Sequence, residues 1–212
     1  MVEINTQKEE QILQIAMQVF VEKGWHGAKM QEIADRAGVN KAMLHYYFRS
    51  KERLYTAILE MLFLKFLNSI ADSFTPGQTF AETLQLFLDH FHEKLKNNPT
   101  LPLFIARELS EGGDRANRVI RQVLKQNELR TPQIMINELK LAQERGEIIP
   151  LEEPVQFLLT LIGSCVYFFL ARPIVQPLFP EIDFHSDAFI EQRKKMIFEH
   201  LYYGLKKREN YP

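Results

Sequence analysis

Basic side chains gather between residues 29 and 53, and their chemistry suits contacts to a phosphate backbone. Six basic residues stand there against three acidic ones, a local charge of +3 in a chain whose formal net charge is -1. The basic members are Lys29, Arg36, Lys41, Arg49, Lys51 and Arg53, and the acidic members are Glu32, Asp35 and Glu52. A local basic patch in a nearly neutral protein is the electrostatic footprint of nucleic-acid binding.

The order of residue types within this stretch is typical of a helix-turn-helix. Two helices that cross closely need a small residue where they touch, a turn former between them, and apolar side chains that lock the second helix onto the first. Ala34 and Gly38 meet the first two needs, and Ile33, Val39 and Leu44 meet the third.

Two residues orient the second helix of this motif. Asn40 is expected to cap it, because its side-chain oxygen accepts from N–H groups of the first turn. If Leu44 points inward, a spacing of about 100 degrees per residue places Tyr47 and Phe48 on the buried side as well.

The opposite face of that helix is expected to enter a major groove of DNA. Its outward members are Ala42, His45 and Tyr46, with Lys41 and Met43 beside them. The full set of predicted DNA contacts is Lys29, Gln31, Asn40, Lys41, Ala42, Met43, His45, Tyr46, Tyr47 and Lys51.

The other residues that could carry chemistry form no catalytic or metal-binding constellation. His90 and His92 are two positions apart, which puts them on different sides of a helix, unlike the i, i+4 pair of a metal site. Cys165 is the single cysteine, so the chain has no internal disulfide, and the polar start Met1–Lys8 does not resemble a signal peptide. We therefore expect no enzyme, no cofactor, no metal and a cytoplasmic location.

One nearly continuous apolar segment runs from Phe157 to Ala171. It falls short of the roughly 20 residues that cross a bilayer, so we expect a buried helix and no membrane contact. A helix that is apolar on every side must be covered all round, and a second subunit is one possible cover.

Helical periodicity, interrupted by prolines and glycines, predicts an all-α chain. No stretch shows sustained period-2 alternation. The segment Thr6–Glu9 has the form of a capping box, and apolar residues then recur at helical spacing up to Gly24. The predicted helices span residues 6–23, 30–37, 40–48, 50–74, 79–96, 102–111, 114–129, 132–145, 154–171 and 184–208.

At these residues the chain resembles the TetR family of bacterial transcriptional regulators. The resemblance is dense from Ile12 to Leu59 and rests on the joint order and spacing of short motifs. These are Val19-Phe20-Val21-Glu22-Lys23-Gly24-Trp25, Ile33-Ala34, Ala37-Gly38-Val39, Leu44-His45-Tyr46-Tyr47-Phe48 and Ser50-Lys51-Glu52. The rest of the chain is similar to the family's larger helical domain in length, helix content and phrases such as Arg145-Gly146-Glu147-Ile148.

The resemblance implies a helix-turn-helix DNA-binding domain over residues 1–50 and a helical effector-binding and dimerisation domain over residues 51–212. It further implies a homodimer that reads a near-palindromic double-stranded operator, and a repressor that is released when an effector favours the DNA-incompetent state. The Tyr47 hydroxyl would reach a phosphate, as its counterpart does in the family.

Two positions depart from the family's pattern. Family members often carry a hydroxyl residue just before the second helix, where this chain has Ala28 and Lys29. They often carry tyrosine where this chain has His45, whose protonation changes near neutral pH.

Aromatic and methionine side chains concentrate after residue 60, and side chains of this kind form cores but also line adaptable apolar pockets. A small hydrophobic effector is therefore expected. Its predicted contacts are Phe66, His90, Phe104, Arg107, Glu108, Gln143 and Tyr167. Arg107 and Glu108 are either a buried ion pair or a polar anchor for this ligand.

The alternative is a TetR-like architectural DNA-binding protein that has no small-molecule ligand and is controlled by a protein partner. A packed core in the larger domain would favour this alternative, and a solvent-filled pocket would favour the effector. In both cases the helices at 154–171 and 184–208 are expected to pair with their symmetry mates as a four-helix interface.

Overall fold

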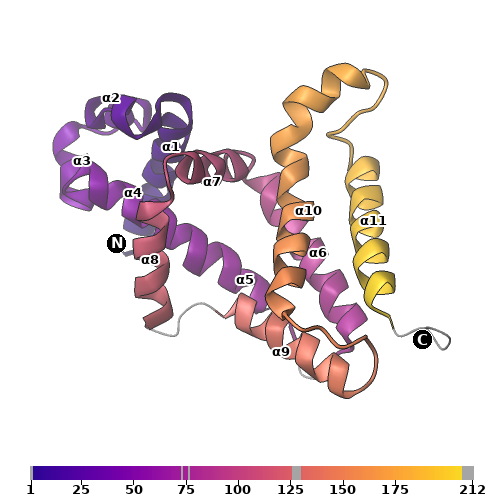
Figure 1. Ribbon diagram of the computed structural model, residues 1–212. Helices are drawn as coiled ribbons and strands as arrows, with labels where there is room; N and C mark the ends of the chain where they lie inside the picture. Colours follow the sequence, from indigo (N-terminus) through magenta and orange to yellow (C-terminus); the bar gives the residue numbers. More distant parts are fainter. Residues whose placement is uncertain (1, 73, 76, 126–129, 207–212) are drawn as a thin grey trace. The chain divides into compact units, whose positions relative to one another are not determined.

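The computed structural model describes residues 2–72, 74–75, 77–125 and 130–206, with all side chains in these ranges except those of residues 2–6, 65 and 66. Its elements are α1 (Val2–Gly27), α2 (Met30–Arg36), α3 (Lys41–Phe48), α4 (Lys51–Glu60), the π-helix η1 (Met61–Leu67), α5 (Asn68–Ala71), α6 (Phe80–Asn97), α7 (Thr100–Ser110), α8 (Asp114–Lys125), α9 (Thr131–Glu144), α10 (Pro154–Val175), the 3-10 turn η2 (Gln176–Leu178) and α11 (Asp187–Leu205) (Figure 1). The predicted all-α class is confirmed: the described residues form helices and connecting segments, with an isolated bridge between Ile148 and Lys206.

The contacts divide the chain into two compact units. Unit 1 comprises Met1–Phe66 and Pro99–Glu128, and unit 2 comprises Leu67–Asn98 and Leu129–Pro212. Helices α7 and α8 therefore belong to the same unit as the predicted helix-turn-helix. This grouping does not say which residues bind DNA or an effector, so the functional boundary predicted at residue 50 stays a prediction.

Two predicted helix boundaries near the N-terminal end need correction. Helix α1 begins at Val2, so Thr6 lies inside the helix and the predicted capping box is wrong. The predicted helix ends before Gly24. In the structure Gly24 has a left-handed φ of 67°, which kinks the helix there, and a last turn follows to Gly27.

Two later predictions also differ from the structure. The helix predicted over 50–74 is α4, η1 and α5 in succession, so its middle is a π-helix and it ends at Ala71. The helix predicted to stop at Ala171 continues through Pro173 to Val175. A proline in the last turn removes one backbone hydrogen bond but leaves the preceding turns intact.

Unit 1 is built where α1 packs against α4 and α7, and α4 packs against α8. Its centre is apolar and closed to solvent: Phe20, Leu54, Ile58 and Phe104 are each at most 1% exposed. The rings of Phe20, Trp25, Tyr55 and Phe104 adjoin one another with centroids 4.8 to 6.0 Å apart.

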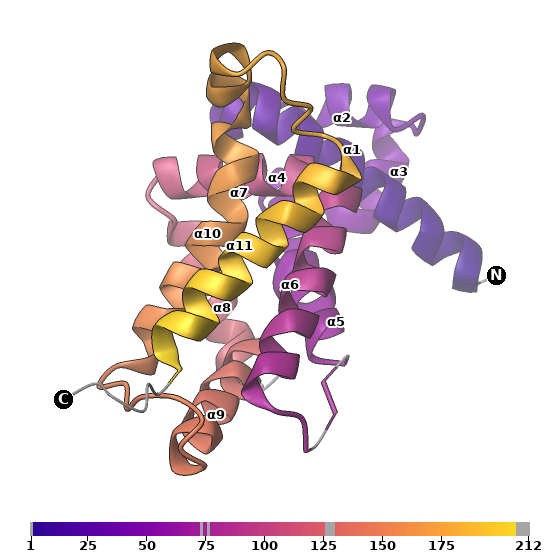
Figure 2. The ribbon, with the colours of Figure 1, turned by 90° about the vertical axis from the view of Figure 1, so that its right-hand side faces the viewer.

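Unit 2 is built from α6, α9, α10 and α11, with α10 and α11 side by side (Figure 2). Helix α6 begins at a capping box in which Thr79 accepts from the Glu82 N–H and the Glu82 carboxylate accepts from the Thr79 N–H. Phe80, Leu84 and Leu161 are fully buried between these helices. Cys165 is buried among them too, as expected, and this burial raises the pKa of its thiol to about 12.

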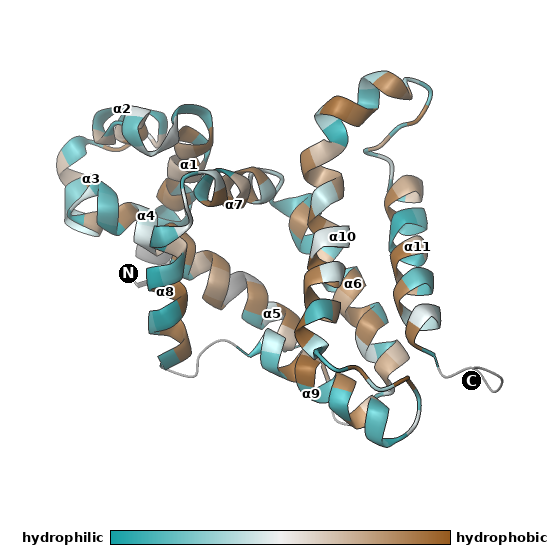
Figure 3. Cartoon of the chain, viewed as in Figure 1, coloured by the Kyte–Doolittle hydropathy of each residue, from teal (hydrophilic) through white to brown (hydrophobic). Residues whose placement is uncertain are grey.

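Helix α10 carries apolar residues along its whole length (Figure 3), and many of them face outward. Leu159, Tyr167 and Ile174 are 63%, 69% and 74% exposed. By length and composition the stretches Lys51–Ala71 and Pro154–Leu178 would suffice to cross a bilayer, a property they share with core helices of soluble proteins. The prediction that α10 is buried is therefore wrong for the single chain described. Only 11% of the most apolar stretch of α10 is buried there.

His92 on α6 is a buried histidine that lacks one hydrogen bond. It is 1% exposed, and its Nδ1 lies 2.8 Å from the Leu88 carbonyl oxygen. A carbonyl only accepts, so Nδ1 carries the proton and Nε2 is an acceptor, for which the described residues provide no donor. Burial lowers the pKa of His92, and the nearby Lys194 and Arg193 act in the same direction.

The burial of neutral His92 predicts that the free energy of unfolding decreases in acid. In the unfolded chain His92 titrates near the ordinary value of about 6.5, so below that pH the unfolded state binds the extra proton and the folded state does not. The free energy of unfolding then falls as the pH drops below about 6.5, by at most about 1.4 kcal/mol per pH unit, until the lowered pKa is reached. His92→Phe should remove this component, measured by urea unfolding across pH 5 to 8, a range of about three units around the ordinary value.

The matched control is His90→Phe, since His90 is half-buried on the same helix and its Nδ1 makes the same contact to the Leu86 carbonyl. If wild type and His92→Phe lose stability with identical slopes, the buried neutral histidine is not the cause.

Candidate nucleic-acid interface

The turn between α2 and α3 has the geometry that the sequence predicts. Ile33, Ala34 and Leu44 are 0% exposed and lock the two helices together. Gly38 adopts φ 62°, a left-handed conformation that strains any residue with a Cβ. The Val39 N–H donates to the Ala34 carbonyl and closes the end of α2.

Both ends of the second helix are fixed by local hydrogen bonds. The Asn40 side chain accepts from the Met43 N–H at 2.7 Å, which confirms the predicted cap of α3. After α3 the chain turns through Arg49 at φ 61°, and the Ser50 hydroxyl then caps α4 by accepting from the Arg53 N–H at 3.1 Å. Helix α3 is therefore a short rigid segment held between two capped corners.

The outward face of α3 is free to meet a partner. Lys41 and Ala42 are exposed, Met43 is 40% exposed, and Tyr46 is 68% exposed, while Phe48 is buried as predicted. His45 is half-buried, with its Nδ1 3.0 Å from the Arg49 carbonyl oxygen.

Tyr47 is intermediate between the two faces of α3. Its side chain is half-buried rather than buried, and its ring lies 5.6 Å from Tyr46 and 6.0 Å from Phe48. A tyrosine at the border of the exposed face is compatible with the predicted phosphate contact of its hydroxyl, and that contact stays a prediction.

Among the described residues, the polar side chains before and within α2 differ in how they are bound: some are tied to other side chains of the protein and one is not. Lys29 is the N-cap residue of α2 and makes no side-chain capping bond, as the missing hydroxyl predicts. Gln31 donates to Asp35 at 2.8 Å on the exposed side of the helix. Arg36 forms ion pairs with Glu22 and Glu32, which raise the pKa of its guanidinium and tie α2 to α1.

Lys51 has a structural partner that the sequence pattern does not reveal. Its ammonium donates to the Ala28 carbonyl at 2.7 Å and lies 4.9 Å from the centre of the Trp25 ring. Partial burial and the charge of Arg115 lower the pKa of Lys51. The side chain therefore braces the turn that precedes α2.

The residues predicted to bind an effector fall into both units. Phe104, Arg107 and Glu108 lie in unit 1, where Phe104 is buried in the aromatic cluster and Arg107 is exposed and donates to the Val21 carbonyl at 3.2 Å. The side chain of Phe66 lies outside the described residues.

Three members of the set lie in unit 2. The Gln143 carbonyl accepts from the Leu151 N–H at 2.6 Å and its amide donates to the Leu139 carbonyl, so this side chain closes a loop. His90 contacts Leu86, and Tyr167 is exposed. His90, Gln143 and Tyr167 do not line the three grooves described below, and their role in binding an effector stays a prediction.

Glu108 is buried, and it forms an ion pair with a residue other than the adjacent Arg107, so the predicted Arg107–Glu108 pair is wrong. It is 1% exposed, and its carboxylate pairs with Arg115 of α8 at 3.2 Å and not with the adjacent Arg107. It also accepts from the Tyr55 hydroxyl at 2.8 Å and from the Ala116 N–H at 2.9 Å. Burial and the bond to Glu108 raise the pKa of Tyr55 far above its ordinary value.

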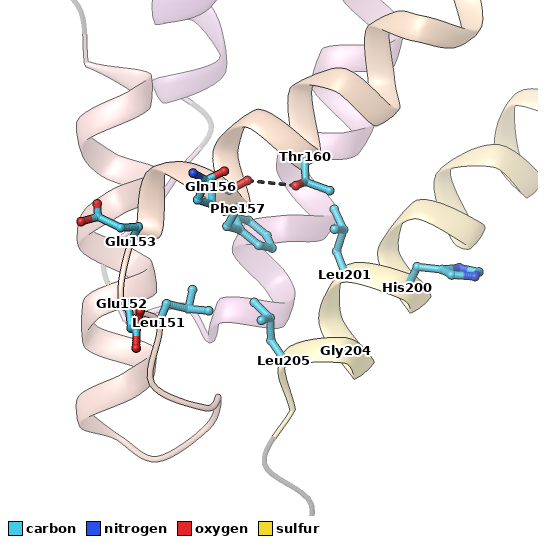
Figure 4. A pocket seen from close by; sticks show the side chains of 10 residues that line it. All are labelled: Leu151, Glu152, Glu153, Gln156, Phe157, Thr160, His200, Leu201, Gly204 and Leu205. Atoms are coloured by element: carbon cyan, nitrogen blue, oxygen red, sulfur yellow. Dashed lines mark hydrogen bonds between the residues drawn. The ribbon is translucent and has the colours of Figure 1, made fainter.

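A groove of about 620 Å³ runs between the start of α10 and the end of α11 (Figure 4). Its walls include Leu151, Phe157, Leu201 and Leu205, and Leu201 and Leu205 point from α11 toward α10. A neighbouring groove of about 330 Å³ continues along the same two helices, since both are lined by Thr160, His200 and Leu201. A third, of about 350 Å³, lies between α6 and α11 and includes His92.

Comparison with known proteins places the helix-turn-helix in a described family. Residues 12–58 match the family model of bacterial regulatory proteins, tetR family. The chain is 38% identical over 85 residues to the HTH-type transcriptional regulator RutR of Escherichia coli K12, which covers 39% of this chain and 40% of RutR. It is 54% identical over 50 residues to the HTH-type transcriptional activator FasR of Mycolicibacterium smegmatis, which covers 24% of this chain and 23% of FasR.

Similarity beyond these residues is one of fold. The crystal structure of the transcriptional regulator FadR from Bacillus subtilis in complex with stearoyl-CoA matches with a TM-score of 0.69 at 19% identity, over 92% of this chain and 98% of that one. At this identity the match shows a shared architecture of an N-terminal helix-turn-helix domain and a larger helical domain. The match spans 40% of the length of RutR.

Proposed function

Because the chain belongs to the TetR family of bacterial transcriptional regulators, we propose that it binds a near-palindromic DNA operator as a homodimer and is released by a small hydrophobic effector. The observation that carries the DNA-binding part is the exposed face of α3. Lys41, Ala42, Met43 and Tyr46 stand outward from a helix whose other face is locked by Leu44 and Phe48. A short rigid helix of this kind fits a major groove, and a two-fold dimer would present two of them about 34 Å apart.

The predicted role of Lys41 is a single phosphate contact. Wild-type protein should enrich an inverted repeat from a random duplex pool, and Lys41→Ala should bind the same duplex more weakly. The slope of log affinity against log salt should fall in magnitude by about 0.9, because one counterion is no longer released. Fluorescence anisotropy titrations at several salt concentrations measure this slope.

The control is Lys140→Ala, which removes an exposed lysine of α9 in unit 2 and should leave the slope unchanged. If the wild-type protein enriches no duplex even at low salt, the proposed function fails.

The dimer is supported by the surface of unit 2. Val155, Leu159 and Ile162 of α10 are 48%, 63% and 36% exposed, and Met196 and Tyr203 of α11 are 48% and 52% exposed. Together with the adjoining grooves, these side chains form an apolar surface that a second copy of the chain would cover. We therefore assign the interface to α10 and α11, in agreement with the four-helix pairing predicted from the sequence.

Leu159→Asp should produce a monomer, because it places a charge in the middle of this surface. Leu159 is exposed in the single chain, so the fold of the protomer should persist, as far-UV circular dichroism would report. Light scattering measures the mass. Leu141→Asp, on the 42% exposed Leu141 of α9, is the matched control and should remain dimeric. A dimeric Leu159→Asp protein would place the interface elsewhere.

The effector is proposed to be amphipathic, with a long apolar chain. Unit 2 is rich in phenylalanine, including Phe80, Phe87, Phe91, Phe157 and Phe168, and apolar burial contributes about 25 cal/mol per Å². The Bacillus subtilis regulator with the same fold was solved with stearoyl-CoA. A long-chain acyl thioester is therefore the first compound to test.

Stearoyl-CoA should raise the melting temperature of the free protein and release it from the enriched duplex. At a hundredfold excess over its dissociation constant the expected stabilisation is about 2.7 kcal/mol. Coenzyme A without the acyl chain is the control and should do neither. If polar metabolites stabilise the protein and acyl compounds do not, the effector class is wrong. If no small molecule shifts melting or DNA binding, the alternative of an architectural protein governed by a protein partner replaces this part of the proposal.

A further inference from the structure

A cluster of polar and aromatic side chains joins four helices of unit 1. At its centre is the Glu108 carboxylate of α7, which accepts from Tyr55 of α4 and from Arg115 and the Ala116 N–H of α8. The Arg115 guanidinium also lies 4.4 Å from the centre of the Trp25 ring, at the kinked end of α1, and 5.2 Å from that of Tyr55.

Further bonds close this cluster around Trp25. The backbone N–H of Trp25 donates to the Glu111 carboxylate at 3.3 Å, and Glu111 also pairs with Arg115 at 3.1 Å. A Cβ at Gly24 would lie 2.7 Å from the Arg107 guanidinium, so the arginine side chain would have to move aside to admit it. Lys51 stands 4.9 Å from the same indole ring.

The position of the cluster in the sequence gives it a consequence for DNA binding. The helix-turn-helix occupies residues 30 to 48. Trp25 lies just before it, and Lys51 and Tyr55 lie just after it. Both ends of the motif therefore contact Arg115 of α8, which in turn pairs with Glu108 of α7.

We propose that Glu108 and Arg115 are positioning residues for DNA binding, and that through them α7 and α8 form one rigid body with the helix-turn-helix. Neither residue lies on α3, and neither is proposed to touch DNA. A ligand or partner that displaced α7 or α8 would then move both ends of the motif together. This inference rests on the proposed DNA-binding function for its effect on affinity, but not for the existence of the rigid body.

Removing one charged side chain from this cluster should force the others to rearrange. A buried carboxylate deprived of its cation retains the cost of its lost hydration. Trp25 and Tyr55 would also lose the guanidinium that packs against both rings. The flanks of the helix-turn-helix would then be free to shift relative to each other.

The test compares three variants of the cluster with a matched surface pair. Glu108→Gln and Arg115→Met break the buried ion pair, and Tyr55→Phe removes a single hydroxyl while keeping the ring, so it remains informative if the other two fail to fold. The control is Arg118→Met, which breaks the exposed pair between Arg118 and Glu52 that joins the same helices α8 and α4 at 2.8 Å.

Affinity for the enriched duplex is the first measurement, made well below the melting temperature of each variant. We expect the cluster variants to lose on the order of tenfold, the equivalent of one charged hydrogen bond, and Arg118→Met to lose none. Glu108→Gln combined with Arg115→Met should lose less than the product of the single effects, because both remove one interaction. A residue with only a structural role would lower the melting temperature and leave the affinity of the folded protein unchanged, and that result overturns the proposal.

Two further measurements do not need DNA. Trp25 is the only tryptophan, so its emission should change in Arg115→Met and stay as in wild type in Arg118→Met. Amide hydrogen exchange in α3 should be faster in the cluster variants. If the wild-type protein binds no duplex, the proposed function fails, and the amide exchange measurement alone then tests the rigid body. Faster exchange in α3 of the cluster variants supports the rigid body, and unchanged exchange overturns it.

Discussion

The burial of the Glu108 carboxylate organises unit 1. A charge that is 1% exposed persists only where donors replace the water it has lost, and here they come from two other parts of the chain, Tyr55 of α4 and the first turn of α8. The need to satisfy one carboxylate therefore fixes three helices against one another. Arg115 extends the constraint to Trp25 and so to the end of α1. The helix-turn-helix is held at its flanks as a result.

A different constraint governs unit 2, where the apolar surface exceeds what one chain can bury. Phe80, Leu84 and Leu161 are enclosed, yet Leu159 and Tyr167, about two turns apart on α10, remain open to solvent. The small residue Gly163 lies between them, and a Cβ there would meet open space. Exposed apolar surface of this extent is a mark of an interaction site. The second copy of the chain proposed above would cover this apolar face of α10, the helix that resembles a membrane span by composition.

The sequence predicts what depends on local spacing and misses what depends on which helices meet. Gly38 and Asn40 form their turn and cap with residues a few positions away in the sequence, so both features can be predicted from local spacing. The DNA contact of Lys51 stays a prediction, whereas its bond to Ala28 joins residues 23 positions apart and could not be predicted without the tertiary fold. The predicted effector contacts stay a prediction, and Glu108 shows why sequence alone does not give its partners: helical period identifies an inward face but not the neighbour it faces, and Glu108 on such a face meets Arg115 and Tyr55.

Helix α7 is the element through which the two constraints can be linked. The chain passes from unit 2 to unit 1 at Asn98 and Pro99, and α7 starts at the next residue. Its 11 residues span about 16 Å and end at the Glu108 cluster. An effector can shift an equilibrium only by the difference in its affinity for two states, and that difference must reach α3 through elements that move as bodies. Helix α7 begins one residue after the chain enters unit 1 and carries Glu108 near its end, so the cluster that holds both flanks of the helix-turn-helix lies one short helix along the chain from that crossing.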